Sequence, residues 1–381
     1  MSQYFDSAQS FLHSFNLHLI QNVLTGEKSD APVFSPACVI MSLALLSEMA
    51  GGNIRRQILD AVGMKDAASF SGYADALWHA ETACNEAEVC SLSSSVWLDQ
   101  KETEGCSRQR ELEKQFELCH AEVFAGEMGS EPVNEALRAW LKESTGGKFQ
   151  DKVSDLSLSP ATRAALYSAL YFKAGWRKRF YETRRAVFHG ENRQGECLLM
   201  KSRETMPYFR GEEFGAVSLG LTCLGKHLFL ILPDENVSAD MVLKSSSFSE
   251  LMQKGEEYPA RDMAEIELYL PKIQADSSLD LVPYLQEEGI SDAFDAARAD
   301  FSLPADMKNS SASLFVNKIN HCTRLEWDER GVEGAAYTEV QMMTSLPYKL
   351  KNIIFRLDRP FIYLIMSGRG TILFAGAVRN L

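Results

Sequence analysis

The sequence lacks several features that would assign a location at once. It has no run of about 20 consecutive apolar residues, so no segment is expected to cross a bilayer as a helix and no membrane partner is expected. Residues 1–24 lack the positive start and the unbroken apolar stretch of a signal peptide. We therefore expect a cytoplasmic protein, or a secreted one from which a leader has been removed.

Regular cysteine spacing is also missing. The eight cysteines include no Cys-x-x-Cys pair, which argues against a zinc site, and their irregular spacing is not typical of a disulfide framework. Free thiols in a reducing compartment are the simpler interpretation. Cys38 and Cys322 lie in apolar stretches and are expected in the core.

Motifs of catalysis are absent too. The chain has no Gly-x-Ser-x-Gly, no His-Glu-x-x-His, no phosphate-binding loop and no dinucleotide fingerprint. The seven histidines are scattered, and His321, in an apolar strand, is expected to be a hydrogen-bonded core residue. We predict that the protein is not an enzyme and carries neither a cofactor nor a metal ion.

The formal net charge of −13 argues against nucleic acid as the main partner, because phosphate binding requires a positive surface. One basic cluster stands out in this acidic chain. It could bind a polyanion, or it could form an ordinary solvated surface. The cluster consists of Arg177, Lys178, Arg179, Arg184 and Arg185.

No internal repeat, low-complexity tract or linker divides the 381 residues, so we predict one domain, 1–381, and a monomer. The first third has helical spacing of apolar residues. Ser35 is expected to cap a helix that has Pro36 at its first position and ends near residues 51–52. Further helices are predicted for residues 8–23, 54–62 and about 133–141.

Strands dominate from residue 164 onward. Helices first and strands later indicate an α+β fold rather than alternating βαβ units. Strands are predicted for residues 228–232, 266–270, 314–327, 353–366 and 371–378.

The segment 329–342 has an unusual period-2 pattern. Its even positions are small or apolar and its odd positions are mostly polar, which predicts a strand with one face fit for a core. Small side chains suit a strand that enters between two others already in place. An ordinary edge strand or a flexible loop would show a similar pattern. The even positions are Val332, Gly334, Ala336, Thr338, Val340 and Met342, and the odd ones are Glu333, Ala335, Tyr337, Glu339 and Gln341.

This segment resembles the hinge and reactive loop of the serpin family, whose pattern is Glu-Glu-Gly-Thr-Glu followed by small residues. Other segments resemble serpin motifs in the same order along nearly the whole chain. They are residues 33–36 (Val-Phe-Ser-Pro), 50–53 (Ala-Gly-Gly-Asn), 140–148 (Trp-Leu-Lys-Glu-Ser-Thr-Gly-Gly-Lys), 169–173 (Ala-Leu-Tyr-Phe-Lys) with Trp176 and Phe180, 231–233, 270–272, 299–301, 359–361 and 373–376.

The resemblance implies the serpin fold. In it, helices surround a large mixed central β-sheet, with two further sheets and an exposed reactive loop, here in residues 329–350. It also implies a hinge and a polar cluster that controls opening of the central sheet. The hinge residues would be Glu329, Gly331, Val332, Glu333, Gly334, Ala335, Ala336 and Thr338, and the cluster would be Ser35, Cys38, Ser168 and His321.

The chain departs from the family pattern at several of these positions. Ser168 stands where the family has Asn, and Cys38 where it has Ser, so weaker hydrogen bonds could change how readily the sheet opens. In the hinge, Val332, Gly334 and Tyr337 stand where Thr, Ala and Ala are common. Val332 is uncharged, Gly334 weakens a strand by ~0.5–1 kcal/mol, and Tyr337 has solvent-facing parity, so none of the three excludes insertion.

The function that the resemblance implies is suicide inhibition of a serine peptidase, with a cysteine peptidase also open. The peptidase cleaves the loop and becomes trapped as an acyl-enzyme when the freed loop inserts as a new strand. The 14 steps from Gly331 to Ser345 span roughly 46 Å at about 3.3 Å per residue, enough to carry the peptidase across the domain. The alternative is a non-inhibitory serpin that acts as a carrier, a chaperone or a peptidase substrate.

Family spacing from the hinge places Ser345 before the scissile bond and Leu346 after it. Counting back from Pro360 gives Leu346 or a later residue, so Met343, Thr344 and Lys349 remain open as well. A bond at Ser345 favours an elastase-like or subtilisin-like target, whereas cleavage at Lys349 would indicate a trypsin-like one.

Overall fold

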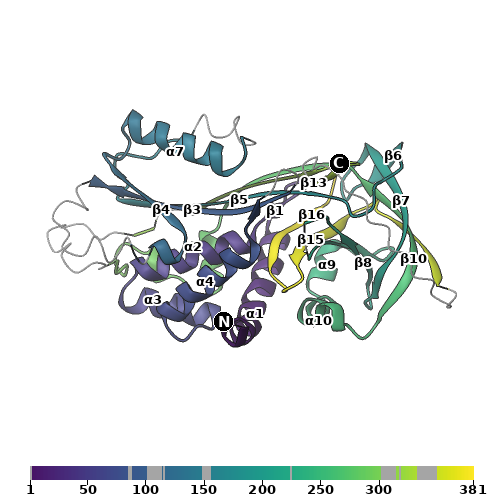
Figure 1. Ribbon diagram of the computed structural model, residues 1–381, viewed down its shortest axis with the longest axis horizontal. Helices are drawn as coiled ribbons and strands as arrows, with labels where there is room; N and C mark the ends of the chain where they lie inside the picture. The colour runs from purple at the N-terminus through teal and green to yellow at the C-terminus, as the bar shows by residue number, and fades with distance from the viewer. Residues whose placement is uncertain are drawn as a thin grey trace.

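Figure 1 shows the computed structural model of the chain. The structure describes residues 2–84, 88–100, 114, 116–147, 156–223, 225–301, 315–316, 319–332 and 350–381. Two β-sheets form the centre of the molecule, and helices cover both faces of one of them, as in an α+β fold. Within these described ranges, no helix is both long enough and apolar enough to cross a bilayer.

The N-terminal part of the chain is helical, as its sequence predicts. The helices are α1 (Ser2–Gly26), α2 (Pro36–Met49), α3 (Gly52–Val62), α4 (Ala67–Glu81), α7 (Glu131–Ser144), α9 (Ala239–Leu243), α10 (Ser246–Lys254) and α11 (Val282–Glu287), with short 3-10 turns at Gly255–Glu257 and Asp292–Phe294.

Helix α2 begins where the sequence predicts. The Ser35 hydroxyl accepts a hydrogen bond from the Cys38 amide at 3.2 Å, and Pro36 occupies the first helical position. Almost every side chain of α2 is buried, which is typical of a helix enclosed on all sides. This helix therefore lies inside the protein, against the sheet that carries the candidate site.

The central sheet has the strand order β11-β12-β13-β5-β3, and β3 also pairs with β2 and β4 at its other edge. It is mixed, because β3 and β4 run parallel whereas the other pairs are antiparallel. Its strands are β2 (Ala83–Cys84), β3 (Val89–Asp99), β4 (Ala121–Gly126), β5 (Ala164–Gly175), β11 (Ile273–Asp280), β12 (Asn320–Trp327) and β13 (Gly331–Val332).

The remaining strands form a second, connected set. The resemblance implies two further sheets, and in this molecule the long strand β7 joins them by pairing with β6, β8 and β10. The path is β1-β16-β15-β9-β8-β7-β10-β14, with β6 beside β7. Its strands are β1 (Val33–Phe34), β6 (Glu182–His189), β7 (Gln194–Arg210), β8 (Phe214–Gly220), β9 (Lys226–Pro233), β10 (Arg261–Pro271), β14 (Lys351–Arg356), β15 (Phe361–Ser367) and β16 (Ile372–Val378).

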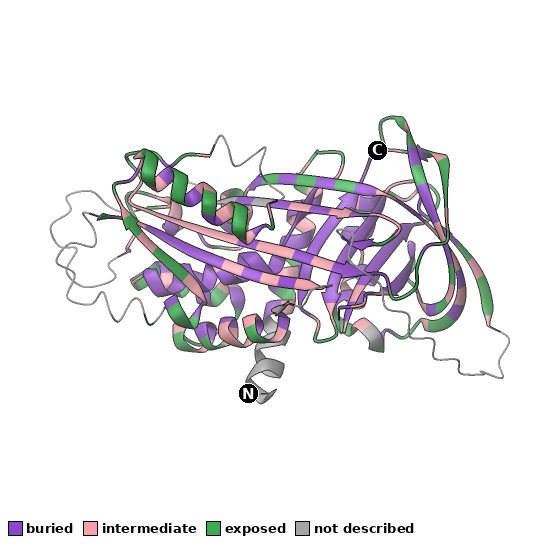
Figure 2. Ribbon diagram, turned by 45° about the horizontal axis from the view of Figure 1, so that its top comes forward, coloured by how far each residue is buried: buried purple, intermediate pink, exposed green. Residues whose placement is uncertain are grey.

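Two hydrophobic clusters lie on the opposite faces of the central sheet. The smaller one lies under α7 and includes Trp97, Leu137 and Trp140. The larger one packs α1–α4 against the other face and continues into the second sheet, where buried residues dominate (Figures 1 and 2). The side chains of a central strand therefore alternate between the α7 side and the main core.

Two strand predictions are wrong in their extent. The predicted strand 314–327 begins only at Asn320, because the backbone of Val316 donates to Ala293 and Ile319 accepts from Leu281, outside the sheet. The predicted strand 353–366 is two strands, β14 and β15, separated at Pro360. Proline lacks the amide hydrogen that a continuous strand would need there.

Candidate functional site

Apart from the two residues of β13, strands β5 and β12 each pair with another described strand along one edge only. The opposite edge of β5 pairs with β3 from Ala164 to Lys173, and the opposite edge of β12 pairs with β11 over its whole length. Among the described strands, no ladder joins β5 to β12, although the two lie close together. The edge of a strand presents backbone amides and carbonyls that can pair with another strand.

The two-residue strand β13 enters between these edges at one end. Gly331 pairs with Gly175 and Val332 with Ala174, while Val332 also pairs with Trp327 on the other side. Val332 is fully buried. A Cβ atom on Gly331 would lie 2.3 Å from the Ala174 carbonyl oxygen, so only glycine fits this passage.

Two tryptophans and an ion pair fix the chain just before β13. The Trp176 indole donates to the carbonyl of Asp328 at 2.6 Å, and the Trp327 indole donates to that of Pro271 at 2.8 Å. Glu329 pairs with Lys272, and this ammonium group lowers the pKa of the Glu329 carboxyl. These contacts hold the start of the predicted hinge at the end of the central sheet.

A polar cluster lies under the middle of the sheet and contacts β12. The Ser35 amide donates to His321 Nε2 at 2.9 Å, and the Thr323 hydroxyl lies 2.7 Å from the same nitrogen. Because Nε2 accepts from an amide, the ring is neutral with its proton on Nδ1. Burial lowers the pKa of His321 to about 4, which agrees with the neutral form.

The same cluster reaches β5 from the other side. The Ser168 hydroxyl lies 2.9 Å from the Ser42 hydroxyl and 3.4 Å from the carbonyl oxygen of Cys38. Burial raises the pKa of the Cys38 thiol to about 11, against hydrogen bonds with Ser35 and Ser168 that lower it, so the thiol is protonated at neutral pH. The first turns of α2 thus contact both strands that flank β13.

The side chains on the core-facing side of β5 are buried beside β13 and become more exposed beyond the end of β13. Ala174 and Phe172, on the core-facing side next to β13, are 0% and 4% exposed. Farther along the same face, Leu170, Ser168 and Leu166 are only partly buried. A strand that continued from β13 would cover this apolar surface.

These features agree with the comparison with known proteins. The family model for serpins, described as serine protease inhibitors, matches residues 11–381. The chain belongs to the serpin family.

The chain is similar in sequence to mammalian serpins. Serpin B6 of Macaca fascicularis is 27% identical over 95% of this chain and 96% of its own length. Serpin B10 of Rhinolophus ferrumequinum is 30% identical over 63% of this chain, and the match spans only 60% of the length of that relative.

Solved serpin structures show the same fold. Native tengpin, a thermophilic serpin, superposes with a TM-score of 0.80 at 20% identity, covering 97% of this chain and 93% of its own. Human thyroxine-binding globulin in complex with its ligand superposes with a TM-score of 0.82 at 20% identity, covering 99% of each chain.

The structure brings together only part of the predicted hinge of this serpin. Glu329, Gly331 and Val332 lie at the end of the central sheet, whereas Glu333, Gly334, Ala335, Ala336 and Thr338 lie outside the described residues. The predicted scissile-bond residues Met343, Thr344, Ser345 and Leu346, and the alternative Lys349, also lie outside them.

The predicted basic cluster lies on the surface of the serpin. Arg177, Lys178 and Arg179 are exposed after β5, and Arg184 and Arg185 are exposed on β6. Arg184 pairs with Glu182, which offsets part of the charge. Polyanion binding by this cluster stays a prediction.

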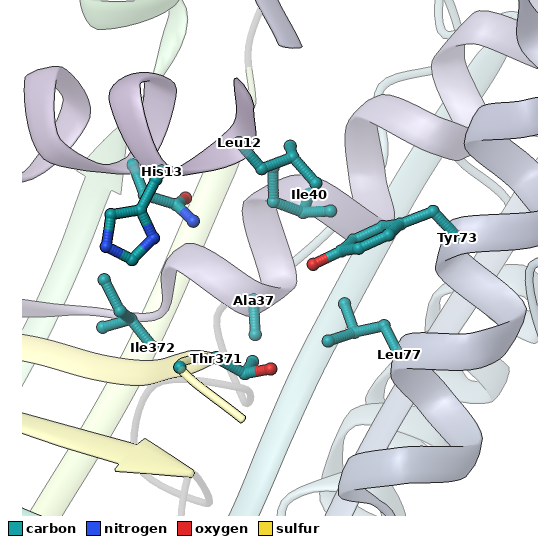
Figure 3. Close-up of a pocket in the computed structure, with 10 residues that line it drawn as sticks. Leu12, His13, Ala37, Ile40, Tyr73, Leu77, Thr371 and Ile372 are labelled. Atoms are coloured by element: carbon teal, nitrogen blue, oxygen red, sulfur yellow. The ribbon is translucent and has the colours of Figure 1, made fainter. Parts of the chain in front are cut away.

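A small pocket lies away from the free strand edges, where α1, α2 and α4 meet the turn before β16 (Figure 3). Leu12, Ile40 and Leu77 form apolar walls, and the buried oxygens of Asn16 and Thr371 have no hydrogen-bond partner among the described residues. Its enclosed space takes about one water molecule. The pocket is therefore too small for a hormone-sized ligand in this conformation.

Several site residues escape sequence analysis. Ser42 and Thr323 contact the predicted residues, yet each has an ordinary local pattern in the sequence. Only the resemblance could have pointed to Lys272 and Trp176, which belong to recognised segments. Long-range partners of this kind become visible only in the folded chain.

Proposed function

We propose that this serpin is a suicide-substrate inhibitor of a serine or cysteine peptidase and not an enzyme. The peptidase nucleophile attacks the carbonyl carbon at the scissile bond and forms an acyl-enzyme. The peptide bond breaks, and the new amino terminus stays with the C-terminal segment of the serpin. The freed loop then inserts between β5 and β12 and carries the bound peptidase with it.

The observation that carries the proposal is the position of β13. Two residues of the predicted hinge already occupy the space between two strands that do not pair with each other. Insertion would extend this short strand along edges whose hydrogen-bonding groups face it. No new pairing register has to be found, because Val332 already pairs with Ala174 and Trp327.

Continuing that register supports the proposal further. Residues of even number would face the core, as Val332 does, and they are small or apolar in the sequence. Between Val332 and Met342 the exception is Thr338, which would lie between Ser168 and His321. Its hydroxyl would therefore meet the polar cluster, and a buried polar group would find partners.

The energy of insertion is sufficient for irreversible trapping. About a dozen residues at ~1 kcal/mol per net hydrogen bond give on the order of 10 kcal/mol. Covering the half-buried Leu166 and Leu170 adds apolar burial. The intact protein would then be kinetically trapped, with the α2 contacts to Ser168 and His321 resisting opening of the sheet.

We further propose that the scissile bond lies at Ser345-Leu346 or within residues 343–349. A cut after Ser345 suits an elastase-like or subtilisin-like peptidase, and a cut after Lys349 suits a trypsin-like one. Mass spectrometry of the peptide released by the peptidase identifies the bond. Cleavage outside residues 342–349 would contradict this register.

A carrier function is the second candidate, because thyroxine-binding globulin has the same fold. The pocket in Figure 3 would not hold the ligand of such a carrier, since its enclosed space takes only about one water molecule. The uncharged, small residues on the inserting face also favour inhibition over a carrier role.

We propose a cytoplasmic, monomeric protein. Cys38, Cys90, Cys119, Cys197 and Cys223 are all buried with free thiols. A chain with so many unpaired thiols suits a reducing compartment.

The test is the thermal stability of the protein before and after cleavage of its loop. Insertion worth about 10 kcal/mol should raise the midpoint of unfolding by about 10 °C in a chain of this size. An unchanged midpoint after complete cleavage would mean that the loop does not insert, and it would favour the carrier or substrate function.

A further inference from the structure

Two histidines and one carboxylate meet on the surface at a place that the inhibitory function does not use. Asp75 and His79 lie on α4, and His120 directly precedes β4. His120 Nε2 lies 2.8 Å from Asp75 Oδ1, and His79 Nε2 lies 3.3 Å from the same oxygen. One ligand atom from each residue lies within 4.8 Å of the others.

In contrast to the prediction from sequence motifs, we propose that Asp75, His79 and His120 form a binding site for a divalent transition-metal ion of the Zn²⁺ type. Tetrahedral zinc with bonds of about 2.0–2.1 Å separates neighbouring ligand atoms by roughly 3.3 Å. The His79–Asp75 separation already matches this value. The other two pairs need rotations of side chains only, because all three groups point toward one place.

The local structure positions all three ligands. Asp75 and His79 are four residues apart on a helix, so they lie on the same face one turn apart. The Trp78 ring stacks on His120 at 3.9 Å between centroids with an interplanar angle of 8°, and its indole donates to the Leu92 carbonyl at 2.8 Å. The anchored indole therefore fixes the plane of the His120 imidazole.

The backbone also favours this position of His120. Its φ angle is +50°, which non-glycine residues adopt rarely. This conformation turns the chain sharply between the preceding helical turn and β4, and it places the imidazole over α4.

The site is open to an ion from solvent. The side chains of Asp75, His79 and His120 are 33%, 63% and 21% exposed. Three protein ligands leave room for water in the fourth position. Two imidazoles and one carboxylate suit Zn²⁺, Ni²⁺ or Cu²⁺, whereas Ca²⁺ and Mg²⁺ prefer sites made of oxygen atoms alone.

The ion would join two parts of the fold. Helix α4 packs beside α2, and β4 forms the parallel edge of the central sheet with β3. An ion bound by both α4 and the residue before β4 would link them in the folded state only. Binding should therefore stabilise the folded protein by an amount that grows with the logarithm of the free ion concentration once this exceeds the Kd.

Isothermal titration of the full chain with zinc chloride at neutral pH tests the site. The variants are His79→Ala, at an exposed position, and His120→Asn, which tolerates the positive φ angle. His189→Ala, which removes another exposed histidine, is the matched control. We expect one zinc ion per chain, a loss of affinity of at least about tenfold in both site variants, and no change in the control.

Thermal unfolding provides a second readout. Zinc should raise the unfolding midpoint of the unmodified protein and of His189→Ala, but not that of His79→Ala. Ca²⁺ and Mg²⁺ should leave the unfolding midpoints of all three proteins unchanged. The proposal is overturned if the unmodified protein binds no zinc, or if His79→Ala and His120→Asn bind it as tightly as the control.

Discussion

The hydroxyl oxygens of Ser42 and Ser168 lie 2.9 Å apart, and this contact joins helix α2 to strand β5. The Ser35–His321 hydrogen bond joins the start of the same helix to β12. The two strands between which we propose that the loop inserts are thus tied to one buried helix. We propose that these hydrogen bonds delay the opening of the sheet without preventing it.

Replacing Ser42 with alanine should loosen the tie to β5. One lost hydrogen bond should lower the free energy of unfolding by about 1 kcal/mol and speed spontaneous conversion to a loop-inserted, inactive form. Urea denaturation and the loss of inhibitory activity on warming measure the two effects. Ser157→Ala, at an exposed serine, is the control. If both variants convert to the inserted form at the same rate, the polar cluster does not control the opening of the sheet.

Gly331→Ala should disturb the entry of the hinge into the sheet. The new methyl group would lie 2.3 Å from the Ala174 carbonyl oxygen, so β13 must shift or leave the sheet. We expect a loss of about 1–3 kcal/mol in urea denaturation and a lower yield of trapped peptidase. Gly72→Ala is the control because its Cβ would meet no atom within 4 Å, and alanine in a helix should be neutral or stabilising.

Val332→Arg should convert the protein from an inhibitor into a substrate. Val332 is fully buried between Trp327 and Ala174, and a guanidinium group there would lack a partner. The peptidase would cleave the loop and dissociate, and cleavage would no longer raise the thermal stability. Glu333→Arg, of opposite parity, should still trap the enzyme, and equal failure of both variants would contradict the assigned parity.

Acid should destabilise the protein through His321. Burial lowers its pKa to about 4 from the ordinary 6.5, so between these values the unfolded chain binds a proton that the folded chain does not. The free energy of unfolding should therefore fall as the pH falls from 6.5 to 4, by up to about 3 kcal/mol from this group. Urea denaturation across that interval measures it.

Two variants distinguish the contribution of His321 to the pH dependence of stability from that of the carboxylates. His321→Gln should show a shallower pH dependence than the unmodified protein, whereas His189→Ala should show the same one. An identical slope in all three proteins would mean that His321 titrates normally in the folded state.

Local signals in the sequence predicted much of the fold. Ser35 and Pro36 begin α2 as expected, and Gly63 ends α3 in the left-handed conformation. Burial alternates along β10, where Ile266 and Leu268 face the core. Each of these features depends on a few neighbouring residues, so sequence alone suffices.

Long-range pairing limited the remaining predictions. Residues 353–366 are apolar enough for one strand, but Pro360 divides them between different partners. Ser42 and Ser168 are 126 residues apart in the chain, and nothing local marks either as a partner of the other. The resemblance predicted the other members of the polar cluster, whereas the part of Ser42 in it is visible only in the folded structure.

The most direct test of the inhibitory mechanism is a gel assay. The protein is mixed with elastase, subtilisin, chymotrypsin, trypsin and a papain-like peptidase, and the products are separated in SDS after denaturation. We predict a covalent complex with at least one of them, together with a released C-terminal peptide that begins within residues 344–350. Complete cleavage of the loop by every peptidase without any SDS-stable complex would contradict the mechanism.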